Sequence, residues 1–127
     1  GILAIAAAKL GASEVVGVDI DPQAVRSAHD NADANNVQAA FFDASQNLPA
    51  PYDAQKYDVV LANILANPLR VLAAALTARL KPGASLVLAG LLAEQAEELI
   101  GIYSPWLEMR VADTQEGWSL LVGALPQ

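Results

Sequence analysis

The chain has 127 residues, of which 54% are hydrophobic, and its 7 basic and 14 acidic side chains give a formal net charge of −7. This length suits one domain, and the acidic balance argues against direct binding of nucleic acid, so a basic protein is the easier partner to expect. Because the chain has no cysteine and only one histidine, we expect neither a disulfide nor a thiolate or multi-histidine metal site.

Helix and strand signals alternate along most of the chain. Gly11 is a natural residue to end a first helix, Asp21-Pro22 predicts the start of a second, and Lys81-Pro82-Gly83 predicts the end of a third. The expected elements are a helix over 2–10, a strand over 14–19, a helix over 22–35, a strand over 37–42, a loop over 43–56, a strand over 57–62, a helix over 68–80, a strand over 85–89, a helix over 93–103, and strands over 107–114 and 118–125.

This order predicts an α/β fold whose sheet is mostly parallel. Strictly alternating strands and helices build right-handed crossovers and a parallel sheet. The last two strands are different, because only Gln115-Glu116-Gly117 separates them and no helix intervenes. Two strands joined in this way must be antiparallel, so we expect the sheet to finish in an antiparallel hairpin.

The start of the chain predicts that one strand is missing. Crossover units are built strand first, but this chain opens with a helix and has no initiator methionine. We interpret it as a fragment that lacks a central strand, and a sheet open at its centre predicts self-association. No signal peptide and no apolar run of roughly 20 residues is evident, so we expect a soluble, cytoplasmic protein without a membrane partner.

Gly1, Asp19, Asp43 and Asn63 are expected at the carboxyl edge of the sheet, where open α/β folds bind ligands. Gly1 stands where the last glycine of a glycine-rich turn would stand, unless it is a random truncation point. Asp19 ends a strand and suits the two hydroxyls of a ribose, with a solvent-facing acid as the alternative. Ile20 suits an adenine face. Asp43 suits the adenine amino group or is simply a loop acid, and Asn63 completes the set.

Asn63 is the candidate for contact with the reacting group, because a carboxamide oxygen accepts a hydrogen bond from an amine nucleophile and orients it. A general base is not evident. His29 lies within a predicted helix, and we interpret it as a surface or packing histidine. For Trp118 two interpretations are open, a position at the mouth of a substrate site or simple packing in the hairpin.

Several motifs together resemble the bacterial ribosomal protein L11 methyltransferase (PrmA) family, and the similarity runs over nearly the whole chain. The valine-rich segment that ends at Asp19 occurs in many methyltransferases, whereas Asn-Ile-Leu-Ala combined with Glu-Gly-Trp is much more specific. The segments that carry the resemblance are Gly1 to Ala7, Val16 to Pro22, Ala62 to Leu69, Lys81-Pro82-Gly83, Gly90-Leu91-Leu92 with Gln95, and Glu116-Gly117-Trp118.

The resemblance implies a class I methyltransferase with a Rossmann-like sheet and S-adenosylmethionine as cofactor. Its expected reaction is methylation of lysine side chains and the N-terminal amine of a large-subunit ribosomal protein. By position, Gly1 would be the last glycine of the cofactor loop, Asp19 the ribose acid, Ile20 an adenine neighbour and Asn63 an active-site residue near the methyl group.

The resemblance also implies that residues 1–127 are an N-terminally truncated catalytic domain. The first strand, most of the Gly-x-Gly loop and the small N-terminal domain that recognises the ribosomal protein are absent. Two alternatives remain at this point: a nicotinamide-dependent oxidoreductase that uses the same ribose carboxylate, and a non-catalytic module with the same fold.

Overall fold

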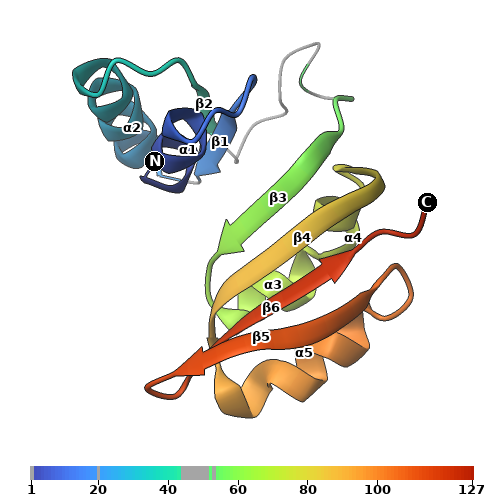
Figure 1. The fold of residues 1–127 in the computed structure, drawn as a ribbon. Helices are drawn as coiled ribbons and strands as arrows, with labels where there is room; N and C mark the ends of the chain where they lie inside the picture. The colour runs from blue at the N-terminus through green and yellow to red at the C-terminus, as the bar shows by residue number, and fades with distance from the viewer. Residues whose placement is uncertain (1, 20, 44–51, 53) are drawn as a thin grey trace. The chain divides into compact units, whose positions relative to one another are not determined.

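The computed structural model describes residues 2–19, 21–43, 52 and 54–127 (Figure 1). The chain divides into two compact units, Gly1–Asp53 and Ala54–Gln127. No helix within the described ranges is long and apolar enough to cross a membrane.

The first unit contains two helices and a two-stranded parallel sheet. Asp21 caps the second helix, because its carboxylate accepts a hydrogen bond from the Gln23 N–H at 2.9 Å and Pro22 follows it. Gly11 ends the first helix with a φ of +103°, as its position in the sequence predicts. The elements are α1 (Ile2–Lys9), β1 (Val16–Asp19), α2 (Pro22–Ala34) and β2 (Ala40–Asp43).

A small apolar cluster holds these elements together. Ala28 and Ala32 of α2 and Phe41 of β2 are buried, and Ala4 of α1 packs against them. A Cβ on Gly17 of β1 would lie 2.7 Å from Phe41 Cδ1. Glycine at this position therefore makes room for the aromatic ring.

The second unit is a four-stranded sheet with helices on one face (Figure 1). The strand order is β3-β4-β6-β5. β3 and β4 are parallel, whereas β6 is antiparallel to both of its neighbours. The antiparallel hairpin predicted from the sequence is confirmed. The elements are β3 (Tyr57–Asn63), α3 (Ala66–Val71), α4 (Ala73–Thr77), β4 (Leu80–Leu92), a 3-10 turn (Ala93–Gln95), α5 (Ala96–Tyr103), β5 (Glu108–Gln115) and β6 (Trp118–Ala124).

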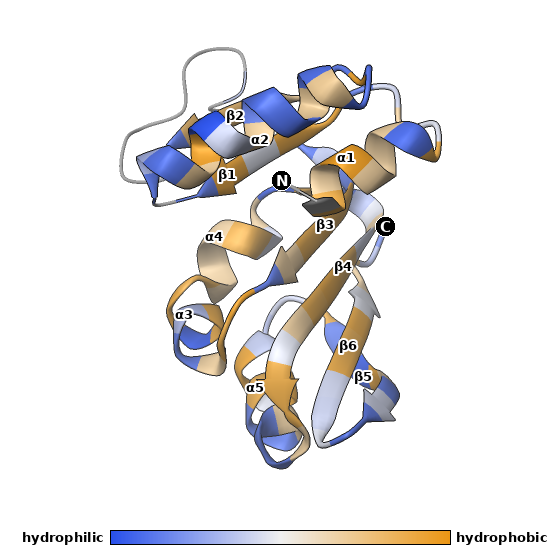
Figure 2. Ribbon diagram, turned by 90° about the vertical axis from the view of Figure 1, so that its left-hand side faces the viewer, coloured by the Kyte–Doolittle hydropathy of each residue, from blue (hydrophilic) through white to orange (hydrophobic). Residues whose placement is uncertain are grey.

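The core of this unit lies between the sheet and its helices. Alternate residues of β3, β4 and β6 point toward the helices, as Ala62, Leu88 and Leu121 do. Tyr103 of α5 is fully buried and donates a hydrogen bond from its hydroxyl to the carbonyl of Leu69 in α3, at 2.8 Å. Figure 2 shows that most of β3 and β4 is hydrophobic, which suits central strands.

Several boundaries differ from those expected, and the three described next are the clearest. The helix predicted over 68–80 is two short helices separated at Leu72, whose φ of −91° and ψ of 6° interrupt the helical path. No proline or glycine over 69–77 marks this break. The strand expected over 85–89 extends over Leu80–Leu92. At its start Leu80 pairs with Tyr57 of β3, and at its end Leu91 and Leu92 pair with Ser119 and Trp118 of β6. Finally, Asp43 is the last residue of β2 and not the first residue of the following loop.

The described strands form two sheets, one in each unit. In the described part of the chain, β1 is paired only with β2, and β3 only with β4. Each of these two strands therefore has one edge without a neighbouring strand among the described residues. The sequence predicts that a central strand of the sheet is missing from this chain, and this stays a prediction. Such a strand would pair with edges of this kind.

Candidate functional site

Two of the predicted cofactor residues lie next to each other in the first unit. β1 and β2 are parallel and in register from Val16 with Ala40 to Asp19 with Asp43. Asp19 and Asp43 are therefore neighbours at the carboxyl edge of this sheet, where α/β folds bind ligands. Two adjacent carboxyl side chains suit a ligand that presents hydroxyl and amino donors.

A hydrogen bond from the backbone of Asp21 orients the Asp19 carboxylate. Its Oδ1 accepts a hydrogen bond from the Asp21 N–H at 3.0 Å. Asp21 in turn caps α2, so its role is structural. Gly1 and Ile20, the other predicted cofactor residues, lie outside the described residues.

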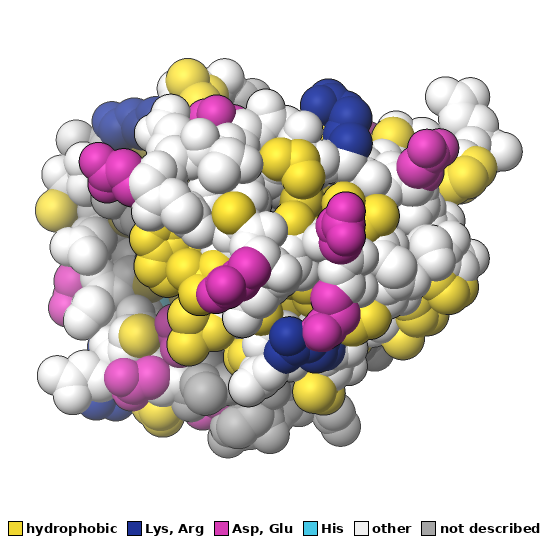
Figure 3. Space-filling model, turned by 90° about the horizontal axis from the view of Figure 1, so that it is seen from below, with side chains coloured by type: hydrophobic (Ala, Val, Ile, Leu, Met, Phe, Trp, Pro, Cys, Tyr) yellow, Lys and Arg dark blue, Asp and Glu magenta, His cyan; other side chains and the backbone are white. Residues whose placement is uncertain are grey.

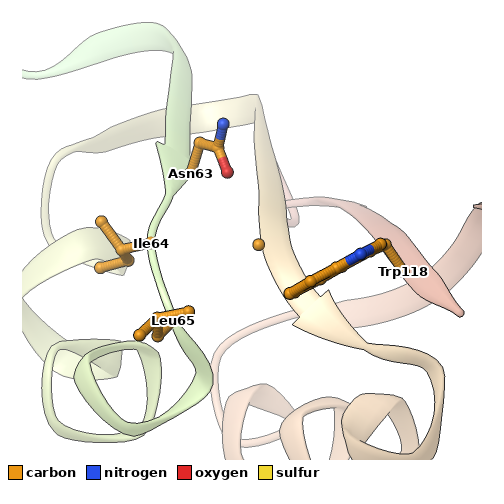
Figure 4. Close-up of a pocket in the computed structure, with 5 residues that line it drawn as sticks. Asn63, Ile64, Leu65 and Trp118 are labelled. Carbon is orange, nitrogen blue, oxygen red and sulfur yellow. The ribbon is translucent and has the colours of Figure 1, made fainter.

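Asn63 lines a pocket in the second unit. It is the last residue of β3, beside Ala89 of β4. The pocket has a volume of about 470 Å³ and is lined by Asn63, Ile64, Leu65, Gly90 and Trp118. In Figure 4 the Asn63 carboxamide and the Trp118 ring extend toward the same space from two different strands. The pocket thus joins one hydrogen-bonding group to an aromatic wall.

Gly90 lets β4 approach Asn63 and Ile64 closely at this pocket, a role that was not predicted from the sequence. Its φ is +86°, and it lies within an irregularity of β4, where the register with β6 shifts between Leu88 and Leu91. A Cβ on Gly90 would lie 2.6 Å from Ile64 O and 3.0 Å from Asn63 Oδ1. A glycine inside a strand pattern often indicates such a bulge or close approach, and this signal was present in the sequence.

Trp118 is held at the pocket by the turn before it. Glu116 and Gly117 have φ values of 51° and 83°, the conformation of a tight hairpin turn. The carbonyl of Gly117 accepts a hydrogen bond from the Ala93 N–H at 2.8 Å, which ties the turn to the end of β4. Trp118 is 49% exposed and lines the pocket, so it is not a core residue of the hairpin.

Gln95 supports the same junction from the other side. Its side-chain Oε1 accepts a hydrogen bond from the Leu92 N–H at 2.8 Å, where β4 ends and the 3-10 turn begins. This bond satisfies the Leu92 N–H, because a backbone N–H at the start of a helical turn has no partner within the turn. Within the motif Gly90-Leu91-Leu92 with Gln95, Gly90 therefore lines the pocket and Gln95 stabilises the end of β4 that follows it.

The predicted site residues belong to both units. Asp19 and Asp43 lie in the first unit, and Asn63 lies in the second. That they form one cofactor and substrate site stays a prediction. His29 is an exposed residue of α2 whose ring meets the Phe41 ring edge-on, with 5.3 Å between the centroids, which agrees with a packing role.

Known proteins place this chain in a family. The family model described as "Ribosomal protein L11 methyltransferase (PrmA)" matches residues 1–125. The ribosomal protein L11 methyltransferase of Neisseria gonorrhoeae is 59% identical over 123 residues, which are 97% of this chain and 40% of that protein. The chain therefore spans about two fifths of the length of such relatives. The match gives no support to the oxidoreductase alternative.

Solved structures agree in fold. The ribosomal protein L11 methylase of Lactobacillus delbrueckii subsp. bulgaricus superposes with a TM-score of 0.87 at 29% identity, covering 100% of this chain and 66% of that one. An RNA methyltransferase of Salinibacter ruber, solved with S-adenosyl-L-homocysteine, has a TM-score of 0.72 at 23% identity and is covered over 75% of its length. From the family match over 1–125 and these similarities, the chain belongs to the ribosomal protein L11 methyltransferase (PrmA) family.

Proposed function

We propose that the full-length protein transfers methyl groups from S-adenosylmethionine to amino groups of a large-subunit ribosomal protein, and that this chain supplies most of its catalytic domain. The observation that carries the proposal is the pocket formed by Asn63, Gly90 and Trp118 in a chain of the L11 methyltransferase family. The amines we expect to be methylated are lysine side chains and the N-terminal amine.

The residues of the first unit fit the cofactor. Asp19 and Asp43 lie side by side at the ends of β1 and β2, so they are suitable acceptors for the ribose hydroxyls and the adenine amino group. In the proposal, Gly1 completes the cofactor loop and Ile20 lies against the adenine. A related fold from Salinibacter ruber holds S-adenosyl-L-homocysteine, which supports this class of ligand.

In the proposed reaction, Asn63 orients the amine of the acceptor. S-adenosylmethionine, when bound, supplies an electrophilic methyl group on a sulfonium. The Asn63 Oδ1 would accept a hydrogen bond from the N–H of the neutral amine, so that the nitrogen lone pair points away from Asn63. Because methyl transfer needs an in-line approach, such orientation contributes more to the rate than a strong base does.

Trp118 suits the remainder of the acceptor side chain. An aromatic ring packs well against the methylene groups of a lysine, and its face attracts a nearby cation. Covering the amine with this ring and with Leu65 would also exclude water from the reacting nitrogen. No general base is assigned.

Calorimetric titration of the full-length protein tests the cofactor. We expect S-adenosyl-L-homocysteine to bind and NAD not to bind. Asp19→Ala should weaken binding at least tenfold, because two hydrogen bonds to one carboxylate are lost. Asp30→Ala is the matched control, since Asp30 is an exposed acid within α2. Tight binding of NAD, or equal affinities in both variants, would contradict the assignment.

Mass spectrometry of purified ribosomal protein L11 tests the reaction. After incubation with the full-length protein and S-adenosylmethionine, we expect added methyl groups that peptide mapping places on amines. Modification only of other atoms would contradict the proposed acceptor. A protein that binds the cofactor but modifies nothing would support the alternative of a non-catalytic module.

A further inference from the structure

A second hollow lies beside the Asn63 pocket, on the β5–β6 hairpin. Its volume is about 230 Å³, and its lining includes Gly90 and Trp118, which it shares with the Asn63 pocket. Asp113 and Gln115 of β5 contribute its polar side. We refer to this hollow as the Asp113 hollow.

An irregularity in β5 puts Asp113 on this face of the sheet. Val111 pairs with Leu121, whereas Asp113 pairs with Leu120, so one extra residue is accommodated between them. In a regular ladder Asp113 would instead oppose Ser119, which is buried. Shifting a strand by one residue moves its side chains to the opposite face. The bulge therefore places Asp113 and Gln115 on the same face as Trp118.

Two hydrogen bonds orient the Asp113 carboxylate. Oδ1 accepts a hydrogen bond from the Thr114 N–H at 2.9 Å, and Oδ2 accepts one from Gln115 Nε2 at 3.0 Å. Both donors are neutral. The ion pairs Arg70 with Glu98 and Lys81 with Asp58 do not include Asp113.

A fixed carboxylate beside an aromatic ring favours a cation. The carboxylate supplies ion pairing, and the ring of Trp118 supplies a negative face. The chain is acidic overall, with a formal net charge of −7, and the basic residue of β5 on this face is Arg110, which pairs with Val122. In Figure 3, acidic side chains are scattered among hydrophobic ones on the face seen from below.

We propose that the Asp113 hollow binds a basic side chain of the acceptor protein, a lysine or arginine that flanks the amine held at Asn63. This inference rests on the proposed function and makes it more specific. Trp118 would separate the two subsites, with the amine to be methylated on the Asn63 side and the flanking cation on the Asp113 side. The preferred acceptor is then an amine with a basic neighbour.

Steady-state kinetics of the full-length protein test this proposal. Asp113→Asn keeps the size and the Oδ1 acceptor but removes the charge. Glu108→Gln is the matched control, because Glu108 is an exposed acid of the same strand that does not line the hollow. At low salt we expect Asp113→Asn to raise the KM for the acceptor about three- to fivefold, as for an exposed ion pair, with kcat unchanged. Glu108→Gln should leave the KM unchanged.

Two further measurements separate the subsite from a general charge effect. The difference between the two variants should disappear at high salt, where exposed charges are screened. Replacing the basic neighbour of the target amine in the acceptor should raise the KM of the wild type but not that of Asp113→Asn. Methyl transfer with equal KM values in both variants would overturn the subsite. Absence of methyl transfer by the wild type would instead overturn the proposed function, and the subsite with it.

Discussion

Gly90 and Asn63 approach each other so closely that a Cβ on Gly90 would lie 3.0 Å from Asn63 Oδ1. The same Cβ would lie 2.6 Å from the carbonyl oxygen of Ile64, a backbone atom that has little freedom to move. The position of the carboxamide therefore depends on a glycine in the neighbouring strand. Orientation contributes much of the rate in methyl transfer, so the contact connects strand packing to the proposed reaction.

Gly90→Ala should impair methyl transfer by the full-length protein. The new Cβ would displace Asn63 and the following backbone, and we expect kcat to fall on the order of 10- to 100-fold, as for other misplaced catalytic groups. Gly11→Ala is the control for backbone strain alone, because its φ is +103° and nothing lies within 4 Å of the added Cβ. Equal activity of the two variants, measured per folded molecule, would contradict the role of Gly90.

Trp118→Ala should weaken binding of the acceptor and not of the cofactor. Removing a ring that lines both hollows eliminates apolar contact and the wall between the two proposed subsites. We expect the KM for the acceptor to rise about tenfold, equivalent to about 1.4 kcal/mol, with the calorimetric affinity for S-adenosyl-L-homocysteine unchanged. Trp106→Ala is the matched control, since Trp106 is 39% exposed and lines neither hollow. An unchanged KM in Trp118→Ala would contradict the prediction.

Tyr103→Phe should destabilise the second unit. The Tyr103 hydroxyl is buried and donates to Leu69 O at 2.8 Å, which fastens α5 to α3. Its loss leaves a buried carbonyl with one partner fewer and should lower the free energy of unfolding by about 1 kcal/mol. Urea denaturation measures this difference. An unchanged free energy of unfolding in Tyr103→Phe would contradict the prediction.

The stability of the wild type should also fall at alkaline pH. Burial raises the pKa of Tyr103 from 10.0 to about 12, because desolvation disfavours the phenolate. Between these values the unfolded chain has lost the proton that the folded chain retains, so the free energy of unfolding decreases as pH rises from about 10 to 12. Tyr103→Phe should show a shallower decrease. Parallel profiles for the two proteins would contradict this assignment.

The 127-residue chain on its own should self-associate. Within the described residues, β1 and β3 each have one edge without a strand neighbour, and such edges pair with other chains. Val59 and Leu61 of β3 are 53% and 44% exposed, which adds apolar surface beside one of these edges. Sedimentation velocity over a range of concentrations should show species larger than a monomer, and a monomer at high concentration would exclude this behaviour.

Local signals in the sequence determined the order and type of the elements. Asp21-Pro22 and Gly11 were correctly assigned to helix ends because a cap depends on residues next to each other in the chain. The final hairpin was predicted because three residues cannot carry a parallel crossover. The family was also evident, since motifs such as Asn-Ile-Leu-Ala are contiguous segments. Asn63 was predicted as a site residue because it follows an apolar run; the structure places it at a pocket, and its role stays a prediction.

Only the tertiary structure decided which residues face Asn63. Gly90 is required at the pocket because two strands approach each other closely there. Trp118 lines the pocket because the carbonyl of Gly117, next to it, accepts a hydrogen bond from the Ala93 N–H. Asp113 lies on the same face of the sheet as Trp118 because a single-residue bulge in β5 moves its side chain to the opposite face. Strand register and bulges depend on pairing between segments distant in the chain. Local propensity contains no information about that pairing. The direction in which these side chains point is therefore decided only when the strands pair in the folded sheet.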